Sequence, residues 1–116
     1  MRKRGEVWLA NLDPHHGTEP GKTRPVLVVQ AQALLDVDHP STLIVPLTTN
    51  LTEGAEPLRI RIPVSAGIQL ESDLLIDQLR AIDNRRLIKG PLATLTSEVM
   101  AAVGEAIQEV LDLAVP

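Results

Sequence analysis

Two short apolar segments on either side of a polar loop near the N-terminus constrain this chain more than any other feature. The segment from Glu6 to Asn11 carries Val, Trp and Leu between turn residues, which is typical of a short strand. The segment from Pro25 to Gln30 is almost continuously apolar, which is typical of a strand buried on both faces. The loop from Leu12 to Thr23 places charged residues beside glycine and proline. We therefore expect two strands joined by a polar loop at the rim of a sheet.

Arg24 stands where this loop re-enters the sheet. A residue before proline is driven into extended geometry, so Pro25 fixes the direction in which Arg24 leaves the loop. Proline cannot donate to a strand ladder, and we expect Pro25 at the first position of its strand. A permanently charged, fork-shaped guanidinium suits bidentate contact with a phosphate. The alternative, which spacing alone favours, is an ion pair between Arg24 and Asp13 or Glu19.

The middle of the chain predicts further short elements. We expect a connection with a short helical turn over 31–41, a strand over 42–47, a helical turn over 84–89 and a strand over 88–95. The segment 58–62 alternates strictly, which predicts a half-buried strand with its Leu and Ile side chains toward the core. Arg59 and Arg61 then face outward together, either solvated or available to position phosphates.

The last segment predicts an amphipathic helix. Thr96 is a suitable N-cap, and Glu98 lies in the first turn, where the helix dipole favours a carboxylate. Apolar side chains then recur at helical spacing. Short strands followed by one such helix indicate a mainly β fold with helices (α+β), a small, strongly bent antiparallel sheet or barrel capped by the helix. At this length we expect a single domain over residues 1–116.

Composition and charge narrow the function. The chain has no cysteine, and the adjacent His15 and His16 lack metal-ligand spacing, so we expect neither a metal nor another cofactor. The net charge is −4, but basic residues gather in the first quarter and acidic ones in the last, so a basic face remains available to nucleic acid. No segment approaches the roughly 20 apolar residues that span a membrane. We expect a soluble, cytoplasmic protein without a membrane partner.

Three ordered segments resemble the MazF/PemK family of toxin endoribonucleases. The first runs from Arg-Gly-Glu-Val-Trp-Leu at residue 4 through Gly17-Thr18-Glu19 to Arg-Pro-Val-Leu-Val at residue 24. The second is Val-Pro-Leu-Thr-Thr at 45–49, and the third is Asp-Gln-Leu-Arg-Ala-Ile-Asp at 77–83. Together they cover almost the whole chain.

The resemblance implies an SH3-like barrel with a C-terminal helix, a homodimer and a cognate MazE-like antitoxin. It also implies sequence-specific cleavage of single-stranded RNA, by which such toxins inhibit translation and growth. The ribose 2′-hydroxyl would attack the adjacent phosphate and leave 5′-hydroxyl ends, so neither a metal ion nor a nucleophilic side chain is required. The protein then has to stabilise the phosphorane oxygens and assist proton transfer.

The family pattern also implies which residues act. Arg24 would be the cation at the phosphate, and a hydroxyl at the end of the second segment would work with it. Thr49 matches that position best, and Thr48 is the other candidate. Glu19 and the Asp77–Gln78 pair would contact the substrate or orient Arg24. The expected substrate contacts are Glu19, Lys22, His16, Asp77 and Gln78.

This chain departs from the family pattern at two positions. Some members carry a histidine where this chain has Thr18, and some carry an arginine where it has Leu75. The resemblance therefore does not supply an acid from the strand that holds Leu75. Whether His15 or His16 replaces the missing histidine stays open.

Two other function classes stay open. A CcdB-like toxin of the same fold poisons DNA gyrase without enzymatic activity, but it depends on a Trp-Gly-Ile ending, and this chain ends Leu-Ala-Val-Pro. An SH3-like binding module would need an aromatic-lined groove, whereas Trp8 is the sole residue among Phe, Trp and Tyr. The loop ending in Arg24 favours the nuclease.

Overall fold

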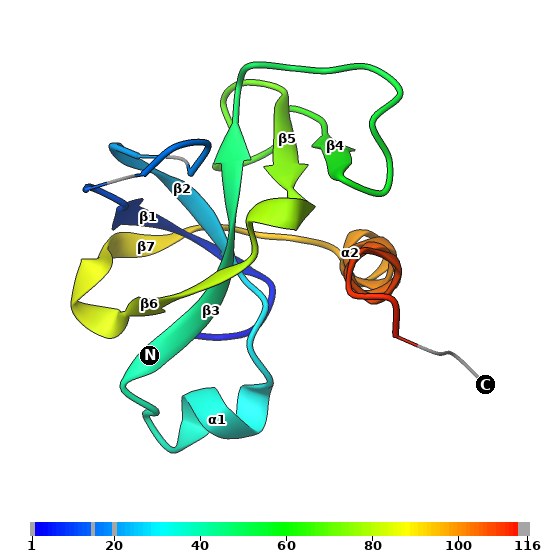
Figure 1. Cartoon of the computed structure of the whole chain (residues 1–116). Coiled ribbons are helices and arrows are strands. Elements are labelled where there is room, and N and C mark those ends of the chain that lie inside the picture. The colour runs from blue at the N-terminus through cyan, green and yellow to red at the C-terminus, as the bar shows by residue number, and fades with distance from the viewer. Residues whose placement is uncertain (1, 15, 20, 114–116) are drawn as a thin grey trace.

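A computed structural model describes residues 2–14, 16–19 and 21–113, arranged around a seven-stranded sheet (Figure 1). The strands are β1 (Glu6–Asn11), β2 (Thr23–Val28), β3 (Ser41–Thr48), β4 (Arg59–Ile62), β5 (Ser72–Leu75), β6 (Arg80–Asp83) and β7 (Leu87–Thr94). The α-helices are α1 (Gln32–Asp36) and α2 (Ser97–Val110), and the 3-10 turns are η1 (Ile76–Gln78) and η2 (Asn84–Arg86).

The strand order confirms a mainly β fold with helices but not a closed barrel. Hydrogen-bonded neighbours follow the order β4-β5-β3-β2-β1-β7, and every pairing is antiparallel. The long strand β3 pairs with β6 near its start and with β5 at its end, so the sheet branches there. Within residues 2–14, 16–19 and 21–113 no pairing joins β4 to β7, so the sheet stays open.

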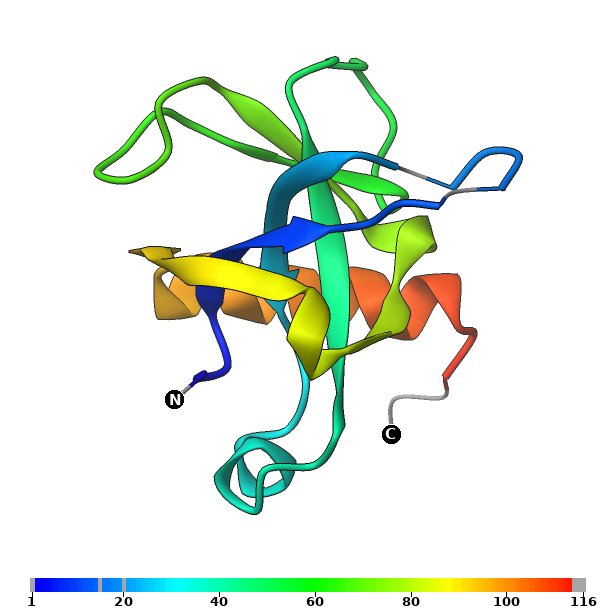
Figure 2. The ribbon, with the colours of Figure 1, turned by 90° about the vertical axis from the view of Figure 1, so that its left-hand side faces the viewer.

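Strand β2 is buried on both faces, as its continuous apolar run predicts. Successive side chains of a strand point to opposite faces. Leu27 belongs to the larger core, which α2 covers with Val103 and Ala106. Val26 belongs to a smaller core on the other face, against which Trp8 packs. Figure 2 shows α2 crossing behind the sheet, so the helix closes the larger core.

The predicted C-terminal helix is confirmed with its cap. The Thr96 hydroxyl accepts a hydrogen bond from the Val99 amide at 3.2 Å, which satisfies one of the free donors of the first turn. Val103 and Ala106 are the buried residues of its apolar stripe. Among the described residues, no helix combines the length and apolar character needed to cross a bilayer.

The position of Pro25 differs from the prediction. Strand β2 begins two residues earlier, because β1 pairs with it as far as Asn11 opposite Thr23. Pro25 is therefore the third residue of β2 and lies opposite Leu9. The paired residues of β2 and β3 begin at Val26, which lies opposite Pro46. Pro25, which has no N–H to donate, therefore lies just beyond the end of this ladder.

The alternating segment also differs from the prediction. Leu58 precedes β4 and is 48% exposed, so it does not face the core. Arg59 and Arg61 are only partly solvated, and neither is free. Both are half-buried and paired with Asp73 of β5, whose buried carboxylate comes from a strand distant in sequence.

Candidate active site

A pocket of about 220 Å³ opens where β2 begins, β3 ends and β5 begins. Four of the predicted site residues meet in it, namely Arg24, Thr48, Thr49 and Lys22. The rest of its lining consists of Thr23, Pro25, Leu47 and Ser72. The resembled segments around residues 24 and 48 are thus adjacent in space as well as ordered in sequence.

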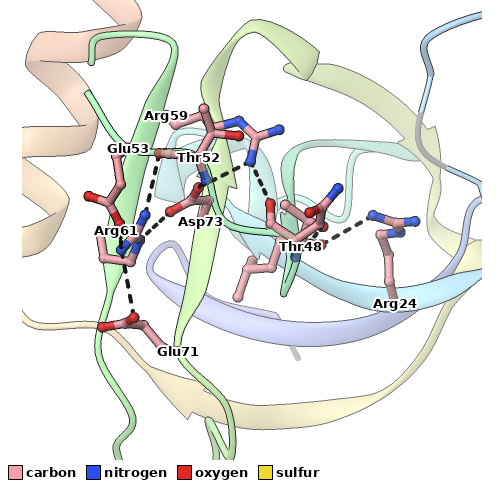
Figure 3. Close-up of polar contacts among 10 residues, drawn as sticks. Arg24, Thr48, Thr52, Glu53, Arg59, Arg61, Glu71 and Asp73 are labelled. Atoms are coloured by element: carbon pink, nitrogen blue, oxygen red, sulfur yellow. Dashed lines mark hydrogen bonds and ion pairs between the residues drawn. The ribbon is translucent and has the colours of Figure 1, made fainter. Parts of the chain in front are cut away.

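Backbone carbonyls hold the Arg24 guanidinium. Its Nε donates to the Gly21 oxygen at 3.0 Å, and its Nη1 donates to the Leu47 oxygen at 3.5 Å. Figure 3 shows the side chain extending toward the end of β3. Across the described part of the chain Arg24 forms no ion pair, so the expected alternative partners Asp13 and Glu19 do not neutralise it. The pocket therefore holds a positioned cation that meets no carboxylate among the residues that the structure describes.

Pro25 explains why the Leu47 carbonyl is available to Arg24. The Val29 amide donates to the Leu43 oxygen at 3.1 Å, and hydrogen-bonding positions recur at every second residue of an antiparallel pair. The register therefore places Pro25 opposite Leu47 at such a position. Because proline has no N–H, it cannot donate to the Leu47 oxygen, and the guanidinium takes that place.

The two threonines differ in how their hydroxyls are held. Thr48 is half-buried at the end of β3, and its Oγ1 accepts a hydrogen bond from the Asn50 amide at 3.1 Å. This bond uses a lone pair and leaves the hydroxyl hydrogen free to be donated. Thr49 also lines the pocket but is exposed. The geometry favours Thr48 as an oriented donor, and a role for Thr49 stays a prediction.

Lys22 lies at the pocket in a left-handed backbone conformation with a φ of 66°. Such a conformation costs a non-glycine residue about 1 kcal/mol. Its amide donates to Asp13 Oδ1 at 2.7 Å, and its carbonyl accepts from the Leu12 amide at 2.8 Å. These two bonds stabilise the conformation and so place a second cation beside Arg24.

Glu19 and His16 lie outside the pocket lining. Glu19 Oε1 accepts from the His16 amide at 3.0 Å, and the Glu19 amide donates to the His16 oxygen at 3.0 Å. Glu19 thus closes a turn within the loop and does not orient Arg24. His16 is exposed in that turn, while His15 lies outside the described residues. Contact of Glu19 and His16 with a substrate stays a prediction.

Asp77 and Gln78 are not brought into the pocket either. Both belong to η1, which follows β5 and packs beside α2. Among the described residues, neither contacts Arg24 through a hydrogen bond or an ion pair. The expectation that they orient Arg24 is therefore not met, and their role as substrate contacts stays a prediction.

Ser72 and Asp73 are parts of this region that the sequence did not single out. Ser72 lines the pocket from β5, with its hydroxyl donating to the Leu70 oxygen at 2.9 Å. Asp73, beside it, is 1% exposed. A carboxylate directly before an apolar run, with an Arg-x-Arg segment elsewhere, was the only available signal.

Asp73 carries its charge inside the fold because two arginines meet it. Arg61 Nε lies 2.6 Å from Oδ1, and Arg59 Nη1 lies 3.1 Å from Oδ2 (Figure 3). Burial acts to raise the pKa of Asp73, but hydrogen bonds from Arg61, the Thr52 amide and Arg59 outweigh it, and the pKa lies below the usual aspartate value. The same contact, with a further bond to Glu53, raises the pKa of Arg61.

Within residues 2–14, 16–19 and 21–113, no group of three histidine or acidic side chains is arranged to hold a metal ion. The pocket itself presents cationic, hydroxyl and apolar side chains. Such a lining suits an oxyanion, and above all a phosphodiester, because Arg and Lys supply charge and hydroxyls supply hydrogen bonds.

Comparison with known proteins places the chain in a family of toxins. A family model described as PemK-like, MazF-like toxin of type II toxin–antitoxin system matches residues 3–111. The chain is 34% identical over 110 residues to "Endoribonuclease EndoA" of Bacillus subtilis, covering 91% of this chain and 90% of that protein. It is 32% identical over 114 residues to "Endoribonuclease MazF" of Staphylococcus saprophyticus, covering 97% and 93% of the two chains.

Solved structures agree with the sequence relatives. The fold superposes on MazF from Deinococcus radiodurans with a TM-score of 0.81 at 25% identity, covering 97% of each chain. It also matches a chain of a MazE–MazF crystal structure from Deinococcus radiodurans with a TM-score of 0.76 at 26% identity, again over 97% of each chain. With a matching family model over nearly its whole length and a matching fold, this chain belongs to the PemK-like, MazF-like toxin family of type II toxin–antitoxin systems.

Proposed function

We propose that this toxin is a sequence-specific endoribonuclease that cleaves single-stranded RNA without a metal ion and thereby inhibits translation and growth. The observation that carries the proposal is the Arg24 guanidinium, held by two carbonyls in a pocket with the Thr48 hydroxyl and without a carboxylate partner among the described residues. Relatives that share about a third of its residues over nearly the full length are named endoribonucleases, which supports the reaction class.

The proposed reaction needs no nucleophile from the protein. The ribose 2′-oxygen loses its proton and forms a bond to the adjacent phosphorus. The bond from phosphorus to the 5′-oxygen breaks, and that oxygen gains a proton. The products are a 2′,3′-cyclic phosphate and a 5′-hydroxyl end. In the transition state between the substrate and these products, the non-bridging oxygens of the phosphate carry extra negative charge. Positioned hydrogen-bond donors stabilise that charge.

The pocket residues supply these donors. The anchored guanidinium of Arg24 faces the developing charge with its remaining N–H groups and also donates to the departing 5′-oxygen. Thr48 donates its free hydroxyl hydrogen to a non-bridging oxygen, since the Asn50 amide already occupies a lone pair. Lys22 adds charge at the same pocket and attracts the RNA backbone.

The distribution of charge supports RNA binding at this pocket despite the acidic total. Lys22 and Arg24 line the pocket, whereas Glu105, Glu109 and Asp112 line a separate hollow beside the end of α2. An anionic strand is thus attracted to one region and repelled by the other. We expect binding to weaken as salt rises, with a slope set by the few phosphate contacts.

We also propose a homodimer and a cognate MazE-like antitoxin as partners. A MazE–MazF structure from Deinococcus radiodurans, whose chain is 26% identical to this one, supports the antitoxin. Val64 and Leu70 are 61% and 64% exposed, and an apolar hollow containing Leu70 adjoins the pocket. A second copy would bury these side chains. Light scattering on the purified toxin, alone and with its antitoxin, tests both assemblies.

The reaction class can be tested with matched oligonucleotides in excess EDTA. Once a cut site is mapped, the same oligonucleotide is made with a single 2′-deoxy sugar on the 5′ side of that site. We expect the all-ribose strand to be cut to a cyclic phosphate and a 5′-hydroxyl, and the 2′-deoxy strand to stay intact. Cleavage of the 2′-deoxy strand would contradict 2′-hydroxyl attack, and complete loss of cleavage in EDTA would contradict metal independence.

A further inference from the structure

We propose that Arg59 and Asp73 are positioning residues that fix the Thr48 hydroxyl for cleavage by holding Asn50. The inference rests on the proposed endoribonuclease function and adds residues that lie outside the pocket lining. It starts from one peptide segment, Asn50 to Thr52, which follows β3 and is exposed.

Asn50 is bound on both of its backbone groups. Its amide donates to Thr48 Oγ1 at 3.1 Å, and its carbonyl accepts from Arg59 Nη1 at 2.7 Å. The first bond orients the hydroxyl, and the second fixes the residue that makes the first bond. A shift of Asn50 would therefore release the rotation of the Thr48 hydroxyl.

Arg59 is in turn held by Asp73. The same Nη1 that meets Asn50 lies 3.1 Å from Asp73 Oδ2, and that oxygen also accepts from the Thr52 amide at 2.9 Å. Asp73 lies directly opposite Thr48 in the pairing of β3 with β5. The carboxylate, the arginine and the threonine are therefore tied to one sheet frame, and Figure 3 shows the contacts running from Asp73 through Arg59 toward Thr48.

The proposed cleavage reaction explains why the segment after β3 needs these hydrogen bonds. The segment after β3 is exposed from Thr49 to Gly54, so no core packing holds it. A hydroxyl donor contributes to the transition state only when it already points at the developing charge. Misplacement of a reacting group by about 1 Å can cost up to about 10² in rate. The network supplies the order that packing does not.

Arg61 offers a control built into the same network. Its Nε donates to Asp73 Oδ1 at 2.6 Å, and its Nη2 donates to the Thr52 oxygen at 3.3 Å. It is two residues from Arg59 on β4 and shares the carboxylate, but its hydrogen bonds go to Asp73, Glu53 and Thr52 and none goes to Asn50. Loss of Arg61 therefore disturbs Asp73 without directly releasing the Asn50 carbonyl.

A double-mutant cycle between Arg59 and Thr48 tests the inference. Single-turnover cleavage of one RNA is measured for the wild type, Arg59→Met, Thr48→Val and the double variant, with urea unfolding of each. Arg59→Met keeps the Asp73 contacts with Arg61 and Thr52, so we expect it to fold. We expect it to cut about 5- to 20-fold more slowly with little change in KM, and to have almost no further effect once Thr48 is valine.

Two further variants separate positioning from general loosening. Arg59→Lys keeps a donor near Asn50 and should recover part of the cleavage rate that Arg59→Met loses. Arg61→Met should lower the cleavage rate by the same small factor whether residue 48 is threonine or valine. Equal slowing by Arg59→Met in both backgrounds, or a wild-type rate for Arg59→Met, would overturn the inference while leaving the nuclease intact. Absence of cleavage by folded wild-type protein would instead overturn the proposed function, and this inference with it.

Discussion

Two arginine sites on the same sheet have opposite surroundings. At the β3–β4–β5 junction, Arg59 and Arg61 share the buried carboxylate of Asp73. At the start of β2, Arg24 is held by the carbonyls of Gly21 and Leu47 and meets no carboxylate among the described residues. The first site pairs its arginines with a carboxylate inside the fold, and the second leaves its guanidinium on uncharged carbonyls.

This difference separates structural arginines from one available for chemistry. A charge that is already paired offers little to an incoming phosphate, whereas carbonyl partners orient a guanidinium and leave its charge intact. In our proposal, the paired site orders the segment after β3 that carries the Asn50 contact with Thr48.

The largest expected effect follows loss of the unpaired charge. Arg24→Ala should lower the cleavage rate by about 10²–10³, the usual scale for one preorganised donor at a developing charge. Because Arg24 donates to two carbonyls but closes no ion pair among the described residues, the free energy of unfolding should fall by only about 1 kcal/mol. Single-turnover cleavage and urea unfolding measure the two quantities.

A matched arginine controls for loss of charge alone. The Arg85 side chain is 91% exposed and pairs with Asp83 at the surface. Arg85→Ala should therefore leave cleavage near the wild-type rate. If both variants lost activity equally, overall charge rather than the pocket would be responsible.

The paired site should respond in the opposite way. Asp73→Ala removes the carboxylate that half-buried Arg59 and Arg61 share, while Arg61 keeps its contacts with Glu53 and Glu71. The change should cost up to about 3 kcal/mol of unfolding free energy, the lower end for a fully broken buried pair. Urea unfolding at neutral pH measures it. A loss below about 1 kcal/mol would show that solvent and the remaining carboxylates of Glu53 and Glu71 satisfy the two arginines.

Pro25 tests how the unpaired arginine is held. Pro25→Ala supplies an N–H that can donate to the Leu47 oxygen and so displaces Arg24 Nη1 from it. We expect cleavage about tenfold slower, since the guanidinium keeps its charge but loses an anchor. Pro63→Ala, at an exposed proline after β4, is the control. A wild-type rate for Pro25→Ala would show that the Gly21 carbonyl suffices.

The smallest expected effect is a pH dependence of the paired site. The folded-state pKa of Asp73 is lowered, so its stabilisation is present above the unfolded value of about 4 and is lost as pH falls below it. The stability difference between the wild type and Asp73→Asn should therefore shrink from pH 6 to pH 3. Urea unfolding across that range measures it, and a constant difference would mean that the Asp73 pKa is not lowered.

Local patterns in the sequence predicted much of this architecture. Strand β1, the burial of β2 and the helix capped by Thr96 follow from periodicity and turn residues that act within a few positions. Family motifs further predicted that Arg24, Thr48 and Thr49 lie near one another, and all three line one pocket. These features depend on residues that are close together in the sequence, or on motifs whose order along the chain can be read from it.

The errors in the sequence prediction concern contacts between distant segments. Alternation in 58–62 showed which side chains share a face, but not that β5 would present Asp73 to Arg59 and Arg61. The hydrogen-bond partner of Glu19 also depended on the conformation of the loop, which turns the Glu19 carboxylate toward the His16 amide. Closure of the sheet required a pairing between its end strands, and no local pattern reports on that.

The most direct test of the account is incubation of the purified toxin, folded and free of antitoxin, with long mixed-sequence RNA in excess EDTA. We predict cuts confined to one short word, with 5′-hydroxyl ends found by end mapping. Intact RNA would contradict the claim that this pocket cleaves phosphodiesters, and inhibition of DNA gyrase would then be the next activity to measure.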